Sequence, residues 1–224
     1  MTINNFIEEL EKLGIKLSDI QLQQLERYYE LLIEYNKVMN LTGITEINEV
    51  YLKHFYDSIT LAKIINLNEI KSLCDIGTGA GFPGLVLKIV FPKINIVLID
   101  SLQKRISFLD KVIEELKLKN IETIHSRIEE FGINNREIFD VVTARAVAPI
   151  NVLLEYAVPL VKVNGYFIPM KAKIDNEPDY LNAIKKLDCS LEDKIEFLLP
   201  NENSTRTLLK FKKNKITIKK YPRR

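Results

Sequence analysis

Residues 73–84 read Leu-Cys-Asp-Ile-Gly-Thr-Gly-Ala-Gly-Phe-Pro-Gly, and the interpretation of the whole chain starts from this stretch. An apolar run ends at Asp75, glycines follow at alternate positions from Gly77 to Gly81, and an apolar helical pattern begins after Pro83. Glycine permits sharp turns and close approach of the backbone to a ligand. The start of a helix offers unpaired N–H groups. The pattern therefore predicts a strand, a glycine-rich turn and a helix that together bind a nucleotide-like cofactor.

Length and composition are those of one globular α/β domain with a small extension. The chain has 224 residues, of which 46% are hydrophobic and 28% are charged. No apolar run approaches the roughly 20 residues of a membrane span, and the acidic N-terminus does not resemble a signal or transit peptide. Only Cys74 and Cys189 are present, so we expect no disulfide framework. We expect a cytoplasmic enzyme that is a monomer and does not associate with membranes.

The first third of the chain has a helical pattern. Apolar residues at helical spacing predict a helix from Ile3 to Leu13, a second one capped by Ser18 or Asp19, and a third from Glu46 to Ile65. The aromatic residues in these stripes are expected in the core, namely Tyr28, Tyr29, Tyr35, Phe55 and Tyr56. We expect residues 1–68 to form a helical extension packed on a core domain of residues 69–224.

From Lys71 onward, short apolar runs alternate with amphipathic helices. The predicted helices are Leu102–Leu118, Ile150–Leu160 and Pro178–Leu187, and the predicted strands are Ser72–Ile76, Ile94–Ile99, Ile121–His125, Ile138–Thr143, Tyr166–Lys171, Leu191–Leu199 and Thr205–Lys212. Such alternation is typical of a parallel sheet covered on both faces. The last two runs have no helix between them and are expected to form an antiparallel hairpin. The expected fold class is therefore α/β and Rossmann-like, with a mostly parallel seven-stranded sheet.

Basic residues are concentrated at the C-terminus. Residues 210–224 carry a formal charge of +8 and no acid, so that the remaining chain sums to −6 although the net charge is +2. A basic cluster on an acidic body suggests a contact with phosphate. A solvated, frayed tail explains the same composition. The basic cluster alone also motivates the hypothesis of a non-catalytic RNA-binding module. This hypothesis leaves the glycine turn unexplained.

The glycine turn alone does not decide the cofactor. Residues 79–84 satisfy the dinucleotide pattern G-x-G-x-x-G, and Asp100 lies 21 residues beyond Gly79, where an acid that binds ribose is expected. A nicotinamide or flavin oxidoreductase therefore remains an alternative. Asp75 favours a different cofactor, because a carboxylate at the mouth of the turn would repel phosphates and attract the ammonium and sulfonium groups of S-adenosylmethionine.

The segment after the third predicted strand is expected at the adenine of either cofactor. Ile128 can pack on the ring, and Glu129 can meet the adenine amino group. Taken alone, Glu129 is more simply an acid at the start of a helix. Only its place in this pattern favours a binding role.

The motifs together resemble the small-subunit ribosomal RNA methyltransferase G family, also called glucose-inhibited division protein B. The match is carried by residues 75–84 and, in order, by Asn40-Leu41-Thr42-Gly43, His54-Phe55-Tyr56-Asp57-Ser58, Asp100-Ser101, Arg127-Ile128-Glu129-Glu130 and Ala144-Arg145-Ala146-Val147-Ala148. The resemblance covers roughly residues 36–171. The common Arg-Ala-Glu-Glu of the family has Ile128 in its second place here, so the adenine contact at this residue is expected through its backbone.

The resemblance implies a class I methyltransferase that transfers a methyl group from S-adenosylmethionine to N7 of one guanine in the decoding-region loop of 16S rRNA, free or in the small ribosomal subunit. The expected cofactor-binding residues are Asp75, Gly77, Gly79, Phe82, Asp100, Ile128, Glu129 and Arg145.

The chemistry of guanine N7 sets few demands on the protein. N7 carries a free lone pair, so no general base is required and no catalytic residue is assigned. With only His54 and His125 and no paired thiols, we expect neither a metal site nor a cysteine nucleophile.

Several further side chains are candidates for contacts near the site. Arg145 follows the fourth predicted strand and is expected to contact cofactor or RNA, although a surface ion pair would also explain it. Lys171 and Lys173 are placed for phosphate contact or simple solvation. His54 and Asp57, three apart on one helix face, are expected either to pair or to reach the pocket.

Overall fold

The computed structural model describes residues 1–145, 148–172 and 177–223 and contains a seven-stranded sheet in the order β3-β2-β1-β4-β5-β7-β6. The strands are β1 (Ser72–Ile76), β2 (Asn95–Asp100), β3 (Ile121–His125), β4 (Phe139–Arg145), β5 (Val161–Lys171), β6 (Cys189–Leu198) and β7 (Thr205–Lys213). Strands β1 to β5 pair in parallel, and β7 pairs antiparallel with both β5 and β6. The predicted Rossmann-like sheet with an antiparallel C-terminal hairpin is confirmed.

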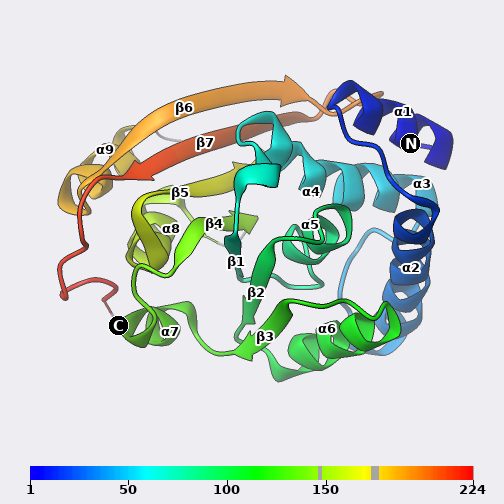
Figure 1. Ribbon diagram of the computed structural model, residues 1–224, viewed down its shortest axis with the longest axis horizontal. Coiled ribbons are helices and arrows are strands. Elements are labelled where there is room, and N and C mark those ends of the chain that lie inside the picture. Colours follow the sequence, from blue (N-terminus) through cyan, green and yellow to red (C-terminus); the bar gives the residue numbers. More distant parts are fainter. Residues whose placement is uncertain (146–147, 173–176, 224) are drawn as a thin grey trace.

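Helices cover both faces of the sheet, in agreement with the mainly apolar sequences of its central strands. In Figure 1, α5 (Gly84–Val90) and α6 (Gln103–Glu115) lie on one face, with α2 (Asp19–Met39) outside them. The other face carries α7 (Ile128–Asn134), α8 (Ile150–Ala157) and α9 (Glu177–Lys186), with the short 3₁₀-helix η4 (Val158–Leu160) after α8. Two clusters of buried side chains, one on each face, form the core.

The N-terminal helices form as expected, with one irregularity. Thr2 caps α1 (Ile3–Lys12), and Ser18 and Gln21 form a capping box at the start of α2. The third predicted helix is a continuous helical stretch made of α3 (Ile47–Val50), the π-helical turn η1 (Tyr51–Tyr56), α4 (Asp57–Ile59) and the 3₁₀-turn η2 (Thr60–Lys63), and η3 (Leu67–Glu69) follows. The π-helical turn was not predicted, because apolar spacing does not distinguish it from an α-helix.

The N-terminal helices share their core with the sheet. Phe6, Tyr28 and Phe55 are fully buried and belong to the same cluster as Leu73 of β1. Tyr56 is also buried, whereas Tyr29 and Tyr35 are partly buried against the cluster. The N-terminal helices thus pack on the sheet, and the division into residues 1–68 and 69–224 stays a prediction.

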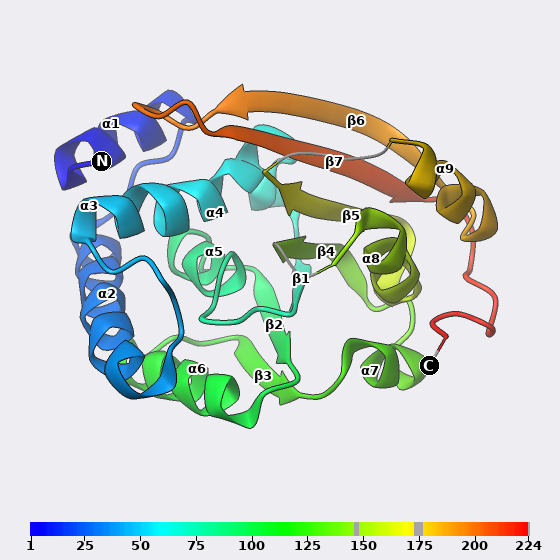
Figure 2. The ribbon, with the colours of Figure 1, turned by 180° about the vertical axis from the view of Figure 1, so that it is seen from behind.

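The C-terminal segment is folded and is not a frayed tail. Lys213 Nζ donates to Glu137 (3.0 Å) and to the carbonyl of Val158 (2.9 Å). Arg223 pairs with Glu155 at 2.7 Å. Figure 2 shows the segment after β7 running down to α7, where the chain ends. Some of the basic residues that were candidates for phosphate contact, such as Lys213 and Arg223, are thus paired with acidic side chains. Phosphate binding by the other basic residues of this segment stays a prediction.

Two further details of the described residues concern the start of β5 and the search for a membrane-spanning helix. Strand β5 begins at Val161, five residues before the predicted start, and contains Asn164 in a left-handed conformation (φ 68°). Within the described ranges, no helix has the length and apolar character needed to cross a bilayer.

Candidate functional site

The glycine-rich turn between β1 and α5 takes backbone conformations that suit glycine. Gly77, Gly79 and Gly81 have φ angles of 67°, 60° and 104°. The hydroxyl of Tyr28, on α2, donates to the carbonyl of Ala80 and would overlap a Cβ atom placed on Gly81. The N-terminal extension therefore braces the turn from behind.

Asp75 lies beneath the turn and not at its mouth. Its carboxylate is fully buried, and Oδ2 accepts hydrogen bonds from the Thr78 hydroxyl (2.7 Å) and the Gly84 amide (2.8 Å). Oδ1 is buried without a partner among the described residues. Burial raises the pKa of this carboxyl to about 7. The sequence correctly tied Asp75 to the turn, but its side chain points to the start of α5 and does not line the cavity described below.

Asp100 ends β2 and is held by the backbone. Its Oδ2 accepts from the amide of Gly79 (2.9 Å), and its Oδ1 accepts from the amide of Leu102 (2.9 Å). Arg105 pairs with Oδ2 at 3.2 Å. The carboxylate is thereby fixed beside the glycine turn, and the ribose contact expected from the spacing of 21 residues stays a prediction.

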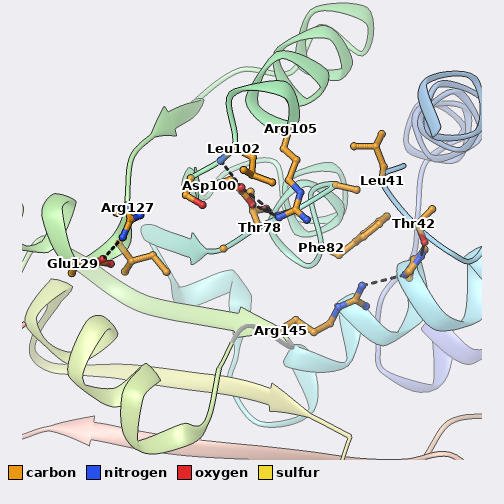
Figure 3. Close-up of a pocket in the computed structure, with 16 residues that line it drawn as sticks. Leu41, Thr42, Thr78, Phe82, Asp100, Leu102, Arg105, Arg127, Glu129 and Arg145 are labelled. Atoms are coloured by element: carbon orange, nitrogen blue, oxygen red, sulfur yellow. Dashed lines mark hydrogen bonds and ion pairs between the residues drawn. The ribbon is translucent and has the colours of Figure 1, made fainter. Parts of the chain in front are cut away.

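The turn and Asp100 open into a cavity of about 670 Å³ at the carboxyl ends of the strands (Figure 3). This volume lies within the range of about 300–1,000 Å³ that is typical of small-molecule sites. Of the expected cofactor-binding residues, all but Asp75 line it, namely Gly77, Gly79, Phe82, Asp100, Ile128, Glu129 and Arg145. His54, which was expected either to pair with Asp57 or to reach the pocket, also lines the cavity. The other lining residues were not predicted as site residues, namely Leu41, Thr42, Thr78, Ala80, Ser101, Leu102, Arg105 and Arg127.

Arg145 ends β4 and is the centre of a buried network. Its NH1 donates to the carbonyl of Lys53 (3.0 Å) and lies 3.4 Å from Asp57 Oδ2, while its guanidinium carbon lies 5.1 Å from the centre of the Phe82 ring. Asp57 in turn accepts from Nε of Arg206, on β7, at 3.0 Å. Arg145 therefore has the ion pair that was considered for it, with Asp57, but this pair lies in the wall of the cavity and not on the outer surface.

His54 and Asp57 do not pair with each other, because both face Arg145. Nδ1 of His54 lies 3.1 Å from Arg145 NH2, and its Nε2 lies 2.8 Å from the hydroxyl oxygen of Thr42. Burial, followed by the charge of Arg145, lowers the pKa of His54 to about 3. The imidazole is therefore neutral, and it stacks on Phe82 with 4.3 Å between ring centres.

Phosphate contact by Lys171 and Lys173, the other candidates near the site, stays a prediction. Lys171 donates to the carbonyl of Ala148, and Lys173 lies outside the described residues. Among the side chains that the structure describes, no three of the His, Cys, Asp or Glu type gather so that they could hold a metal ion. The absence of a metal from the working protein stays a prediction.

Comparisons with known proteins point to one family. The family described as rRNA small subunit methyltransferase G matches residues 21–204. The ribosomal RNA small subunit methyltransferase G of Bacillus subtilis (strain 168) is 49% identical over 230 aligned positions, covering 100% of this chain and 95% of that protein. The protein of the same name from Lysinibacillus sphaericus (strain C3-41) is 47% identical, covering 100% of this chain and 96% of its own.

Solved structures at low sequence identity share the fold. A SAM-dependent methyltransferase from Aquifex aeolicus superposes with a TM-score of 0.57 at 17% identity, covering 74% of this chain and 93% of that chain. TYW2 of M. jannaschii, solved in complex with AdoMet, gives a TM-score of 0.54 at 17% identity, covering 65% and 70%. The family match and the curated relatives, which are named as methyltransferases, support neither the oxidoreductase alternative nor a non-catalytic binding module.

Proposed function

The chain belongs to the rRNA small subunit methyltransferase G family, and from this premise we propose that it transfers a methyl group from S-adenosylmethionine to N7 of one guanine in 16S rRNA. The observation that carries the proposal is that the glycine turn, Asp100, the start of α7 and Arg145 all border the same cavity. These elements are far apart in the sequence, and the cavity brings them together.

The residues present fit the proposed cofactor. A Cβ atom placed on Gly79 would meet nothing within 4 Å, so the turn leaves open space where the methionine part would lie. Asp100 would accept from the ribose hydroxyls in place of Arg105, whose NH1 donates to Oδ2 at 3.2 Å, while the backbone amides of Gly79 and Leu102 keep the carboxylate in position. Ile128 and Glu129 would hold the adenine. Asp75 would act from below, by fixing the turn and by placing a titratable carboxyl close to a cationic ligand.

The reaction needs orientation more than proton transfer. When bound, S-adenosylmethionine supplies a methyl group on a positively charged sulfur. Guanine N7 has a free lone pair, so the protein has no proton to remove and works by placing the base in line with that methyl group. Oriented binding of this kind contributes on the order of 7–11 kcal/mol in favourable cases. Phe82, with His54 stacked on it and Arg145 beside it, forms a rigid wall for that placement.

The proposal is tested on RNA that lacks the modification. The protein is incubated with labelled S-adenosylmethionine and with 16S rRNA or 30S subunits from cells without the enzyme, and modified nucleotides are mapped. We expect one methyl group at N7 of one guanine. If no guanine N7 is methylated in either the free 16S rRNA or the 30S subunits, the proposal is contradicted. Gly77→Val serves as the inactive control, because the added side chain would fill the turn, and calorimetry should find no cofactor binding to it.

The remaining expectations belong to the same proposal. A substrate of ribosomal RNA suggests a cytoplasmic protein, and the reaction as written requires no metal. We propose that it acts as a monomer, which sedimentation of the purified protein would test.

A further inference from the structure

The hydrogen-bond network around His54 fixes its tautomer. An arginine can only donate, so Nδ1 of His54 accepts from Arg145 NH2. A neutral imidazole carries one N–H, which must then be on Nε2. Nε2 lies 2.8 Å from the Thr42 hydroxyl oxygen, so the histidine donates and Thr42 accepts.

The Thr42 oxygen receives a second hydrogen bond from its own loop. The amide of Ile44 donates to it at 3.0 Å. A hydroxyl oxygen has two lone pairs and one hydrogen, so both lone pairs are used. Among the described residues, no acceptor takes the hydroxyl hydrogen, and Thr42 lines the cavity. The network thus makes Thr42 a hydrogen-bond donor that can no longer accept.

The loop that carries Thr42 is held in place. The side chain of Asn36, on α2, accepts from the amides of Leu41 (2.6 Å) and Thr42 (2.9 Å) and donates to the carbonyl of Thr42 (2.9 Å). Asn40 ends α2 in a left-handed conformation (φ 53°). His54 lies on the π-helical turn η1, an element that occurs often at functional sites. The donor is therefore oriented before any ligand arrives.

Thr42 lies at the end of the cavity that the cofactor's adenine would not occupy. Figure 3 shows Arg127 and Glu129 at one end and Thr42, Phe82 and Arg145 at the other, with Asp100 between them. We call the region of Gly77, Gly79, Asp100, Ile128 and Glu129 the cofactor end, and that of Thr42, His54, Phe82 and Arg145 the acceptor end. With adenine at the cofactor end, the base to be methylated enters at the acceptor end.

We propose that the Thr42 hydroxyl donates to O6 of the target guanine and so selects guanine over adenine, an inference that rests on the proposed function. Guanine presents two acceptors, N7 and O6, on its major-groove edge, whereas adenine presents N7 and an amino donor. A donor that cannot accept matches O6 and opposes the adenine amino group, which would be buried against it without a partner. N7 is present in both purines, so the methylated atom alone does not distinguish them.

The test compares guanine with adenine at the methylated position. We would prepare 16S rRNA with either base at the mapped site and measure kcat/KM for wild type, Thr42→Val and Thr42→Ser. Loss of one hydrogen bond predicts about a tenfold fall in kcat/KM on guanine RNA for Thr42→Val and a similar narrowing of the guanine-to-adenine ratio. Thr42→Ser keeps the donor and should keep both values. Thr45→Val is the matched control, because Thr45 is exposed on the same loop and does not line the cavity.

Two further measurements separate the possible failures. The affinity for S-adenosylmethionine, measured by calorimetry, should be equal in wild type and Thr42→Val. A loss of cofactor affinity with an unchanged guanine-to-adenine ratio would overturn the inference, as would a Thr42→Val enzyme with wild-type kinetics. RNA with 2-aminopurine at the site, which keeps N7 and lacks O6, should slow the wild-type enzyme about tenfold and tests the contact even if the variant does not fold. Wild type that methylates no guanine would instead refute the proposed function.

Discussion

At the cofactor end of the cavity, backbone amides hold the key carboxylate, whereas at the acceptor end side chains hold one another. Asp100 accepts from the amides of Gly79 and Leu102. Arg145 has one backbone partner, the carbonyl of Lys53, and otherwise donates to the side chains of His54 and Asp57. Asp57 also pairs with Arg206. A site held by backbone keeps its geometry when one side chain changes, while a network of buried charges loses several contacts at once. The two ends should therefore respond differently to substitution.

The largest expected effect is on the backbone that makes the cofactor end rigid. In Gly81→Ala, the new Cβ atom would overlap the Tyr28 hydroxyl and lie 2.9 Å from Leu85 Cβ, at a φ of 104° that side chains rarely adopt. Strain and overpacking together predict a loss of about 4 kcal/mol in the free energy of unfolding. Urea titration measures it. Gly43→Ala is the control, because its Cβ would meet nothing within 4 Å and its stability should not fall.

Among substitutions at the acceptor end, we expect the largest loss of stability when the charge of Asp57 is removed. Asp57→Asn leaves Arg145 and Arg206 close together without their shared counterion, in side chains that are each 17% exposed. Loss of one partner from a buried ion pair predicts a fall of about 3 kcal/mol in the free energy of unfolding.

The same charge change on the surface provides the comparison for Asp57→Asn. Glu49→Gln removes an exposed partner of Lys53 in the same helical stretch and should cost less than about 1 kcal/mol. Equal losses in the two variants would show that the Asp57 network is no more important than a surface pair.

The proximity of the residues at the cofactor end could be predicted from the sequence, because their places in the fold follow from local patterns, while their role in binding a cofactor stays a prediction. Gly77 and Gly79 follow a recognisable strand, and Asp100 ends the next strand of a parallel sheet, so that their proximity follows from the fold. The placement of Asp75 at the mouth was wrong because the direction of a side chain depends on which amides lie near it. The amide of Gly84, nine residues on, draws this carboxylate under the turn.

The acceptor end could not be assembled from the sequence. Thr42, His54 and Arg145 lie on a loop, a π-helical turn and a strand end, and no periodicity relates them. The helical spacing of His54 and Asp57 suggested a pair, but Arg145, at the end of β4, donates a hydrogen bond to each of them. Thr42 is part of the Asn40-Leu41-Thr42-Gly43 motif, but the sequence does not show that His54 and the amide of Ile44 both donate to its hydroxyl oxygen.

Stability should depend on pH through Asp75, the buried carboxyl beneath the glycine turn. Its pKa of about 7 in the folded protein lies above the usual value of 3.8. Below pH 4 both states hold the proton. Between about pH 4 and 7 the unfolded chain gives it up first, so the folded protein loses stability as pH rises.

Asp75→Asn should remove this pH dependence, because the amide keeps an oxygen for Thr78 and Gly84 and carries no charge. The free energy of unfolding of the variant relative to wild type should rise by about 3 kcal/mol between pH 5 and pH 8. Urea titrations of both proteins at the two pH values measure the change. A difference that does not vary with pH would mean that Asp75 is ionised in the folded protein throughout this range.

The smallest effect is expected for Arg105→Gln, which sharpens the comparison between the two ends. Arg105 pairs with Asp100 as closely as Arg206 pairs with Asp57, at 3.2 Å against 3.0 Å, but its side chain is 37% exposed. Asp100 also keeps its two backbone amides when the arginine is lost. We therefore expect the free energy of unfolding to change by less than about 1 kcal/mol, as for exposed ion pairs, and the affinity for S-adenosylmethionine by less than about threefold. Calorimetry and urea titration on the same preparation measure both. If Arg105→Gln instead cost as much stability as Asp57→Asn, the backbone would not be what holds Asp100, and the contrast between the two ends would be lost.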